Sequence, residues 1–302
     1  MSITKLPPDA VVVHVPLLGG AFGRRHFNDF VTEAVQISTT VGAPVKLTWT
    51  RDDDIQHDRY HPLSRTYVSV KLDETGRPAR LPRPDPYPMT VGVPTGYWRG
   101  VENVTEAFAR ESFLDEIAAA ASLDPLELRL QLAPQPGQAV LRLAAEKAGW
   151  GSPLPEGWGR GIAYFATFGV THVAQVAEVS VTPEGQVRVH RVVCAVDCGT
   201  VVNPDTVVAQ MEGGIVFGLT AALKASVTVE KGRVQQSNFH DYPLLRIDEM
   251  PAVEVYIIPS GAEPSGIGEM GVPPIAPAVA NAVFAATGKR VRHLPIRPED
   301  LL

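Results

Sequence analysis

A proline-dense stretch between Arg77 and Pro94 is the strongest constraint that this sequence places on its own fold. It holds six prolines, namely Pro78, Pro82, Pro84, Pro86, Pro88 and Pro94. Because proline lacks a backbone N–H and fixes φ, this spacing excludes a helix and a central strand of a sheet. We therefore expect a connector over residues 77–94.

The segment before this connector alternates between β-branched runs and a helical pattern. Residues 10–15, 45–49 and 66–72 are expected strands, and residues 28–41 are an expected helix with its apolar residues on one face. A glycine loop from Gly19 to Arg25 lies between the first strand and the helix. Strand, loop, helix and strand in this order are typical of an α/β layer.

Helical patterns follow the connector, and strands dominate after them. Helices are expected at residues 105–123, 126–132 and 137–148, and the Gly/Pro-rich loop 149–159 marks the expected domain boundary. Further strands are expected at residues 162–167, 173–181, 187–196, 225–229, 233–236 and 253–258, and further helices at 205–223 and 276–287. The sequence thus predicts an α+β protein of mixed sheets with packed helices, in two regions, 1–150 and 151–302.

Composition excludes several classes of function. The 302 residues are 45% hydrophobic, enough for a sizeable core, and the net charge of −6 comes without a Lys/Arg-rich run. We therefore expect no nucleic-acid partner. No apolar run approaches the length of a membrane span, and residues 1–7 lack the apolar core of a secretory signal. A cytoplasmic protein without a membrane span is expected.

The two cysteines, Cys194 and Cys198, end an apolar run. A metal or iron–sulfur site needs about four ligands, and Cys-x3-Cys supplies only two of them. Two buried thiols at the end of a strand are the simpler interpretation. The sequence therefore predicts no iron–sulfur centre built from this chain's own thiolates, and no side-chain metal site.

One carboxylate, Glu269, lies between two glycines in the run Gly268-Glu269-Met270-Gly271-Val272-Pro273-Pro274. Glycines let backbone approach a cofactor closely, and paired prolines restrict the turn that aims the acid. An ordinary surface turn is the alternative. The loop Gly19–Arg25 leaves a similar choice open: it could receive an anion before a helix, yet it matches neither a dinucleotide-binding nor a Walker motif.

Glycines also interrupt the expected helix 205–223, at Gly213, Gly214 and Gly218. Because glycine costs helix stability, its presence there indicates close packing, against either another helix or a flat cofactor. Trp98 and Arg99 place a cation beside aromatic rings, a composition typical of pocket walls and of packed surfaces.

Three other patterns favour structure over chemistry. The run Asp52–Asp54, with nearby His57, Asp58 and His61, is expected to cap and solvate a helix rather than bind metal. The pair His240-Asp241 could seat a base, but a lone pair in a loop is more often structural. No serine lies in a nucleophile-elbow motif, so a hydrolase of that type is not supported.

Taken together, the motifs resemble the molybdenum-binding large subunit of the xanthine dehydrogenase/aldehyde oxidase family, in its isoquinoline 1-oxidoreductase beta-subunit branch. The resemblance spans nearly the whole chain. Its motifs are Gly19–Arg25, Trp49–Ile55, Trp98-Arg99, Glu111–Glu116, Val196–Gly199, Asn203–Asp205, Gln210–Gly214, Asp241–Arg246 and Gly268–Pro274.

The resemblance implies the fold and chemistry of the molybdopterin-binding domains of a molybdenum hydroxylase large subunit. It implies that Glu269 is the catalytic base, and that Trp98 and Arg99 line the substrate pocket. Gln210 and Gly213 would approach molybdopterin in its cytosine dinucleotide form. The implied contacts to the molybdenum end of the cofactor are Gly19, Gly20, Phe22, Gly23 and Arg24. The implied reaction hydroxylates an N-heterocycle or an aldehyde with oxygen from water.

Departures from the family pattern concern completeness. The relatives are longer, their Gly-Gln-Gly cofactor motif is missing here, and the connector 77–94 looks shorter than theirs. The resemblance implies a small [2Fe-2S] subunit as electron acceptor, and a separate chain could supply the missing N-terminal half. An export signal on that part would make the location periplasmic. The alternative function is a non-catalytic remnant or split-subunit piece that binds a partner chain and holds no cofactor alone.

Overall fold

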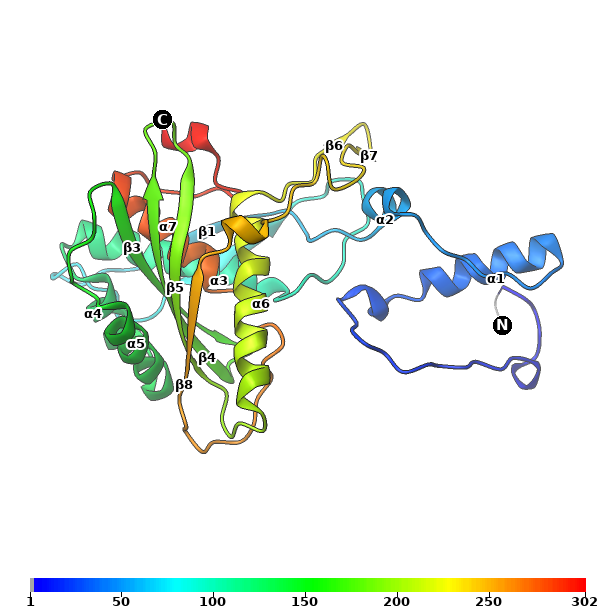
Figure 1. The fold of residues 1–302 in the computed structure, drawn as a ribbon, viewed down its shortest axis with the longest axis horizontal. Coiled ribbons are helices and arrows are strands. Elements are labelled where there is room, and N and C mark those ends of the chain that lie inside the picture. The colour runs from blue at the N-terminus through cyan, green and yellow to red at the C-terminus, as the bar shows by residue number, and fades with distance from the viewer. Residues whose placement is uncertain (1–2) are drawn as a thin grey trace. The chain divides into compact units, whose positions relative to one another are not determined.

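The structure, a computed structural model, describes residues 3–302, and the chain forms two compact units (Figure 1). The first unit comprises Met1–Pro62, Thr90–Arg99 and Val227–Asp241; the second comprises Leu63–Met89, Gly100–Ser226 and Tyr242–Leu302. These units do not coincide with the expected regions 1–150 and 151–302. The boundary at residue 150 lies inside the second unit, because α5 (Gln135–Ala148) packs on the sheet that follows it.

A four-stranded sheet is the centre of the second unit. Its strands are β3 (Trp158–Thr167), β4 (Thr171–Val181), β5 (Val187–Asp197) and β8 (Ala252–Ile257), in the order β3-β4-β5-β8. The pairs β3-β4 and β4-β5 are antiparallel, and β5-β8 is parallel. The turn at Pro183–Gly185 joins β4 to β5, as its sequence predicts. The mixed sheet confirms the predicted α+β class.

Helices cover both faces of this sheet (Figure 1). Because successive residues of a strand face opposite sides, Ile162 and Tyr164 pack with α5 while Ala163 packs in the other core cluster. That second cluster holds the buried residues of α6 (Pro204–Leu223) and α7 (Ile275–Thr287). The sheet thus separates two apolar cores, and α6 and α7 share one of them.

Two further helices complete the second unit's core. α3 (Glu102–Ala120) packs on α7 and on α4 (Pro125–Leu132). A buried ion pair ties these elements to the sheet: the Glu111 carboxylate accepts from Arg129 Nε at 2.8 Å and from the Tyr164 backbone N–H at 3.1 Å. Because both charged side chains are only 1% exposed, each depends on the other for compensation.

The connector holds one strand that the sequence did not predict. β2 (Arg83–Pro88) pairs with β1 (Ser64–Ser69) in a two-stranded antiparallel sheet. Pro84, Pro86 and Pro88 occupy every second position of β2. Their missing N–H groups therefore lie along one edge, which leaves the other edge free to pair. The exclusion of a helix and of a central strand is confirmed.

The first unit contains α1 (Asp29–Val41), α2 (Arg51–His57) and a two-residue ladder between β6 (Val229–Glu230) and β7 (Arg233–Val234). α1 matches its prediction, ending at Gly42 with φ of 67°. The predicted strands 10–15 and 45–49 are wrong as regular strands, because neither has a pairing partner among the described residues 3–302. The predicted strands 225–229 and 233–236 shrink to the short ladder.

Three short 3-10 helices lie in the loops, at Pro8–Ala10, Arg24–His26 and Ile247–Glu249, and a fourth, Pro298–Leu301, lies at the end of the chain. Among the described residues, one helix, α6, is long and apolar enough to cross a membrane by length and composition alone, although no such span was expected from the sequence. Its residues Met211, Ile215 and Leu219 lie in the core beside the sheet. A buried core helix passes the same test, so this is weak evidence for a span.

Candidate functional site

Glu269 lies in the loop that leads into α7 of the second unit. Its side chain is half-buried, and its backbone carbonyl accepts from Val272 N at 3.1 Å, which closes a turn. The next side chain, Met270, is 4% exposed and packs in the core shared by α6 and α7. The carboxylate is therefore carried by a loop that is anchored at the following residue.

Two polar side chains on β4 hold this loop, and neither was predicted from the sequence. Gln175 Nε2 donates to the Gly271 carbonyl at 2.9 Å, and the Thr171 hydroxyl donates to the Gly266 carbonyl at 2.7 Å. Both side chains are fully buried. The available signal was their spacing, because residues 171 and 175 of a strand face the same side and are polar within an apolar run.

The segment after β5 supports the other end of the loop. Asp197 accepts from the Gly199 N–H at 3.1 Å and from the Ser260 hydroxyl at 2.6 Å. Thr200 N donates to the Ala262 carbonyl at 2.8 Å. Gly199 has φ of 75°, and a Cβ there would lie 2.1 Å from the Glu263 carbonyl oxygen. Only glycine fits this approach of the two segments.

The glycines of α6 pack against the same loop. A Cβ on Gly214 would lie 3.2 Å from Gly271 Cα, and one on Gly218 would lie 2.5 Å from the Ile275 side chain. The open choice between a helix and a cofactor at these two positions is thus settled by the Glu269 loop and the start of α7. The neighbouring Gly213 is exposed and Gln210 is half-buried.

The glycine loop of the first unit meets the segment that precedes Trp98 and Arg99. Gly23 has φ of 72°, and a Cβ there would lie 2.3 Å from the Tyr97 carbonyl oxygen. The Tyr97 ring also packs on His26 and Phe27, with centroids 5.0 and 5.9 Å apart. The structure therefore brings two predicted site segments together, although they are more than 70 residues apart in the sequence.

The remaining side chains of the glycine loop differ in exposure. Phe22 is 89% exposed with φ of 52°, and nothing lies within 4 Å of a Cβ built on Gly19. A Cβ on Gly20 would lie 2.7 Å from the Phe22 ring. Phe22 therefore projects from a strained backbone without covering Gly19.

Arg24 is engaged by carboxylates of its own unit. Its Nη1 lies 2.6 Å from Asp29 Oδ1, and its Nε lies 2.6 Å from Asp58 Oδ1. Although burial alone opposes the change, the bond to Asp29 and the charge of Asp58 raise the pKa of this guanidinium. The geometry gives Arg24 a structural role; its predicted contact to a cofactor stays a prediction. Trp98 packs edge-on against His61, with ring centroids 5.6 Å apart.

The predicted site residues divide between the two units. Gly19, Gly20, Phe22, Gly23, Arg24, Trp98 and Arg99 belong to the first unit, and Gln210, Gly213 and Glu269 to the second. Each unit assembles its own members.

The patterns predicted to be structural are structural. Thr50 and Asp53 form a reciprocal capping box at the start of α2. Asp241 accepts from the backbone N–H groups of Ser237 and Asn238. Over residues 3–302, no group of three or more His, Cys, Asp or Glu side chains is arranged to hold a metal ion.

Both cysteines are free and buried, as predicted. Burial raises the pKa of the Cys194 thiol to about 12 and also raises that of Cys198. These thiols are therefore neutral at physiological pH and are poor metal ligands or nucleophiles.

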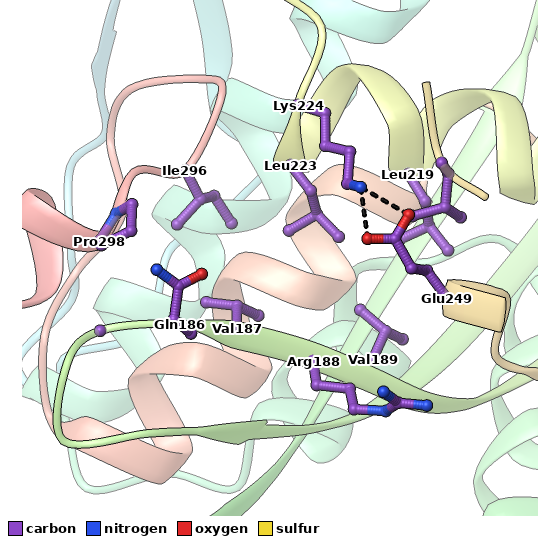
Figure 2. Close-up of a pocket in the computed structure, with 12 residues that line it drawn as sticks. Gln186, Val187, Arg188, Val189, Leu219, Leu223, Lys224, Glu249, Ile296 and Pro298 are labelled. Carbon is purple, nitrogen blue, oxygen red and sulfur yellow. Dashed lines mark hydrogen bonds and ion pairs between the residues drawn. The ribbon is translucent and has the colours of Figure 1, made fainter. Parts of the chain in front are cut away.

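A cavity of about 210 Å³ lies on the second unit between β5, α6 and the C-terminal segment (Figure 2). Its wall is mainly apolar, and the Lys224–Glu249 ion pair lies at one side. None of the predicted site residues lines it. This cavity is therefore separate from the loop that carries Glu269.

Comparison with known proteins agrees with the motifs. Two sequence profiles, both described as molybdopterin cofactor-binding domains, match residues 1–81 and 109–251. The isoquinoline 1-oxidoreductase beta chain of Brevundimonas diminuta is 34% identical over 98% of this chain and 44% of its own length. A nicotinate dehydrogenase large chain of Pseudomonas putida is 39% identical over 70% of this chain and 19% of its own length.

Solved structures share the fold. Quinoline 2-oxidoreductase from Pseudomonas putida 86 superimposes with a TM-score of 0.80 at 15% identity, covering 94% of this chain and 67% of that one. The aldehyde oxidoreductase of Desulfovibrio desulfuricans also gives 0.80, at 14% identity, over 94% of this chain and 53% of that one. The chain spans less than half the length of the curated relatives that match nearly all of it.

Proposed function

Because the chain belongs to the molybdopterin cofactor-binding family of molybdenum hydroxylase large subunits, we propose that it is the part of such an enzyme that carries the catalytic base. The reaction is the hydroxylation of an N-heterocycle or an aldehyde with oxygen from water. The names of the relatives support both substrate classes, since they include an isoquinoline oxidoreductase, a nicotinate dehydrogenase and an aldehyde dehydrogenase.

The geometry of the Glu269 loop is the observation that carries this proposal. Buried groups far away in the sequence, Gln175 and Thr171, fix a loop whose carboxylate is half-buried. Nothing lies within 4 Å of a Cβ built on the adjacent Gly268, so the backbone leaves room for a flat group. A fixed carboxylate beside open space suits a general base better than it suits an ordinary surface turn.

The residues present fit a molybdopterin cofactor. The open spaces at Gly19 and Gly268 and the exposure of Gly213 leave backbone that such a group can approach. When bound, molybdopterin supplies a metal centre that takes two electrons from the substrate. Glu269 would accept a proton at its carboxylate as the substrate carbon gains its oxygen, and Trp98 and Arg99 would orient the substrate.

Electrons would then leave through a separate iron–sulfur subunit. The two thiols of this chain are buried and neutral, so they support an acceptor centre on another polypeptide. The cytosine dinucleotide form of the cofactor and a cytoplasmic location are further parts of this proposal.

Metal analysis and one substitution test this function. Co-expressed with its iron–sulfur and remaining large-subunit partners, the chain should purify with molybdenum. Glu269→Gln should then abolish turnover while the metal stays bound. Glu263→Gln, which alters an exposed carboxylate of the same loop, is the matched control and should keep full activity. Retained turnover in Glu269→Gln would refute the assignment of the base.

A non-catalytic piece that binds a partner chain is the second candidate function. The observation that favours it is the coverage of 44% and 47% of the two relatives that match nearly the whole chain. Absence of molybdenum from both the isolated chain and the co-expressed assembly would select this candidate over the enzyme.

A further inference from the structure

The N-terminal part of the first unit lacks a core of its own. Not one residue of the described range 3–62 is buried. Apolar side chains are highly exposed there, with Val12 at 74%, Val13 at 76% and Val15 at 85%. An apolar surface of this extent is typical of a protein interface rather than of a free surface.

Two extended segments of this part have unpaired backbones. We call Val11–Val15 and Val45–Trp49 the open strands, since the sequence predicts strands at both places. In the described part of the chain, no backbone hydrogen bond is made by residues 12–15 or 45–49. Side-chain burial nevertheless alternates along Val45–Trp49, as it does in a strand with one covered face. The segments thus have the chemistry of strands without a sheet.

The order of elements shows how a sheet would form. The open strands flank α1, which gives a strand–helix–strand unit. Such a unit places its two strands parallel in one sheet, with the helix on one face. α1 has no buried residue, and Val31 and Val41 on it are exposed, so this face also lacks its cover. One sheet from elsewhere would satisfy both the strands and the helix.

We propose that the open strands extend a β-sheet of a second polypeptide, one that carries the remainder of the molybdopterin-binding large subunit. The chain spans 44% of its relative in Brevundimonas, so more than half of that relative's sequence has no counterpart here. Main-chain pairing gives the affinity of strand addition, and the alternating valines give its register.

This inference rests on the proposed function, because it completes the same cofactor site. The loop Gly19–Arg25 begins four residues after Val15. Fixing the first open strand in a sheet would therefore also fix where that loop leaves the sheet, and loops at strand ends are where ligands bind in α/β layers.

Hydrogen exchange tests the surface without any assay of activity. The probe is the portion of the Brevundimonas relative that this chain does not span, produced as a separate polypeptide. In the free chain, amides of the open strands should exchange as fast as those of an unfolded peptide. In the complex they should be protected. The same probe joined to Met1 by a flexible Gly/Ser linker raises its effective concentration to the millimolar range.

Two variants of Val13 separate the backbone from the side-chain contribution. Val13→Pro removes a ladder N–H and Val13→Asp removes an apolar contact; each should weaken the complex about tenfold or more. The matched control is Val202→Asp, which changes a valine that is 90% exposed on the second unit and should bind normally.

Three results would overturn the proposal: open strands protected in the free monomer, open strands protected only in a dimer of this chain, or open strands unprotected in the linked fusion. A protected complex that contains no molybdenum would refute the proposed function and leave the surface intact. Molybdenum binding with open strands still in fast exchange would refute the surface alone.

Discussion

Replacing Gln175 with methionine tests whether β4 positions the loop of the catalytic base. Methionine keeps the length and volume of the side chain but cannot donate to the Gly271 carbonyl, now 2.9 Å from Gln175 Nε2. Both groups lie in the core, where Gln175 is 0% exposed. The substitution therefore removes one buried hydrogen bond with little change in packing.

The expected magnitude follows from two opposing contributions. Leaving the Gly271 carbonyl without its donor costs about 1–3 kcal/mol. Gln175 Oε1 is itself buried with no hydrogen-bond partner, so its removal returns about 1 kcal/mol. We expect a net loss of roughly 1 kcal/mol in the free energy of unfolding.

Gln175→Glu is the comparison variant, and its pH dependence has a definite sign. A buried carboxylate cannot donate to a carbonyl, while the protonated acid can. Burial would raise the folded pKa of this Glu above its unfolded value of about 4.3. Its stability should therefore be highest below about pH 4 and should fall as pH rises through the folded pKa.

Urea unfolding and hydrogen exchange measure the effect. In Gln175→Met the Val272 amide, which bonds to the Glu269 carbonyl, should exchange faster relative to amides of β4. If the free energy of unfolding and the Val272 exchange rate both match the unsubstituted protein, Gln175 does not position the loop.

Three further predictions concern the frame around the site. Arg129→Met should cost about 3–5 kcal/mol in urea unfolding, because it leaves the Glu111 carboxylate buried without its cation; a variant that also carries Glu111→Gln should recover part of the loss. Gly199→Ala should destabilise more than Gly169→Ala, because both have positive φ but only Gly199 meets a carbonyl, at 2.1 Å; equal losses would contradict the packing argument. Both thiols should resist Ellman's reagent at pH 8 until the protein unfolds, and since burial raises the Cys194 pKa to about 12, stability should decline as pH rises above about 8.5; rapid labelling of the folded protein would refute this.

Local patterns were enough to predict the helices. The ends of α1 and α7 follow from the glycines at positions 42 and 288, both in the left-handed conformation. Asp124 caps α4 through the N–H groups of Leu126 and Glu127, as its position before Pro125 suggests. Helix hydrogen bonds join residues four apart, so a window of the sequence contains most of the information.

Strands were predictable only where the chain also supplies their partners. The apolar runs that became β3, β4, β5 and β8 pair with one another within the second unit. The equally β-branched run 10–15 forms no ladder, because its hydrogen bonds depend on a strand that the sequence window cannot show.

By itself, the sequence determined the helices, the burial of the two cysteines, the family, and a carboxylate between glycines at position 269. Only the tertiary structure decided what holds that carboxylate: Gln175 lies 96 residues from the Gly271 carbonyl that it binds. It also decided that Gly214 makes room for the Glu269 loop. The physical reason is that periodicity and propensity report contacts a few residues apart, whereas these depend on which distant segments pack together.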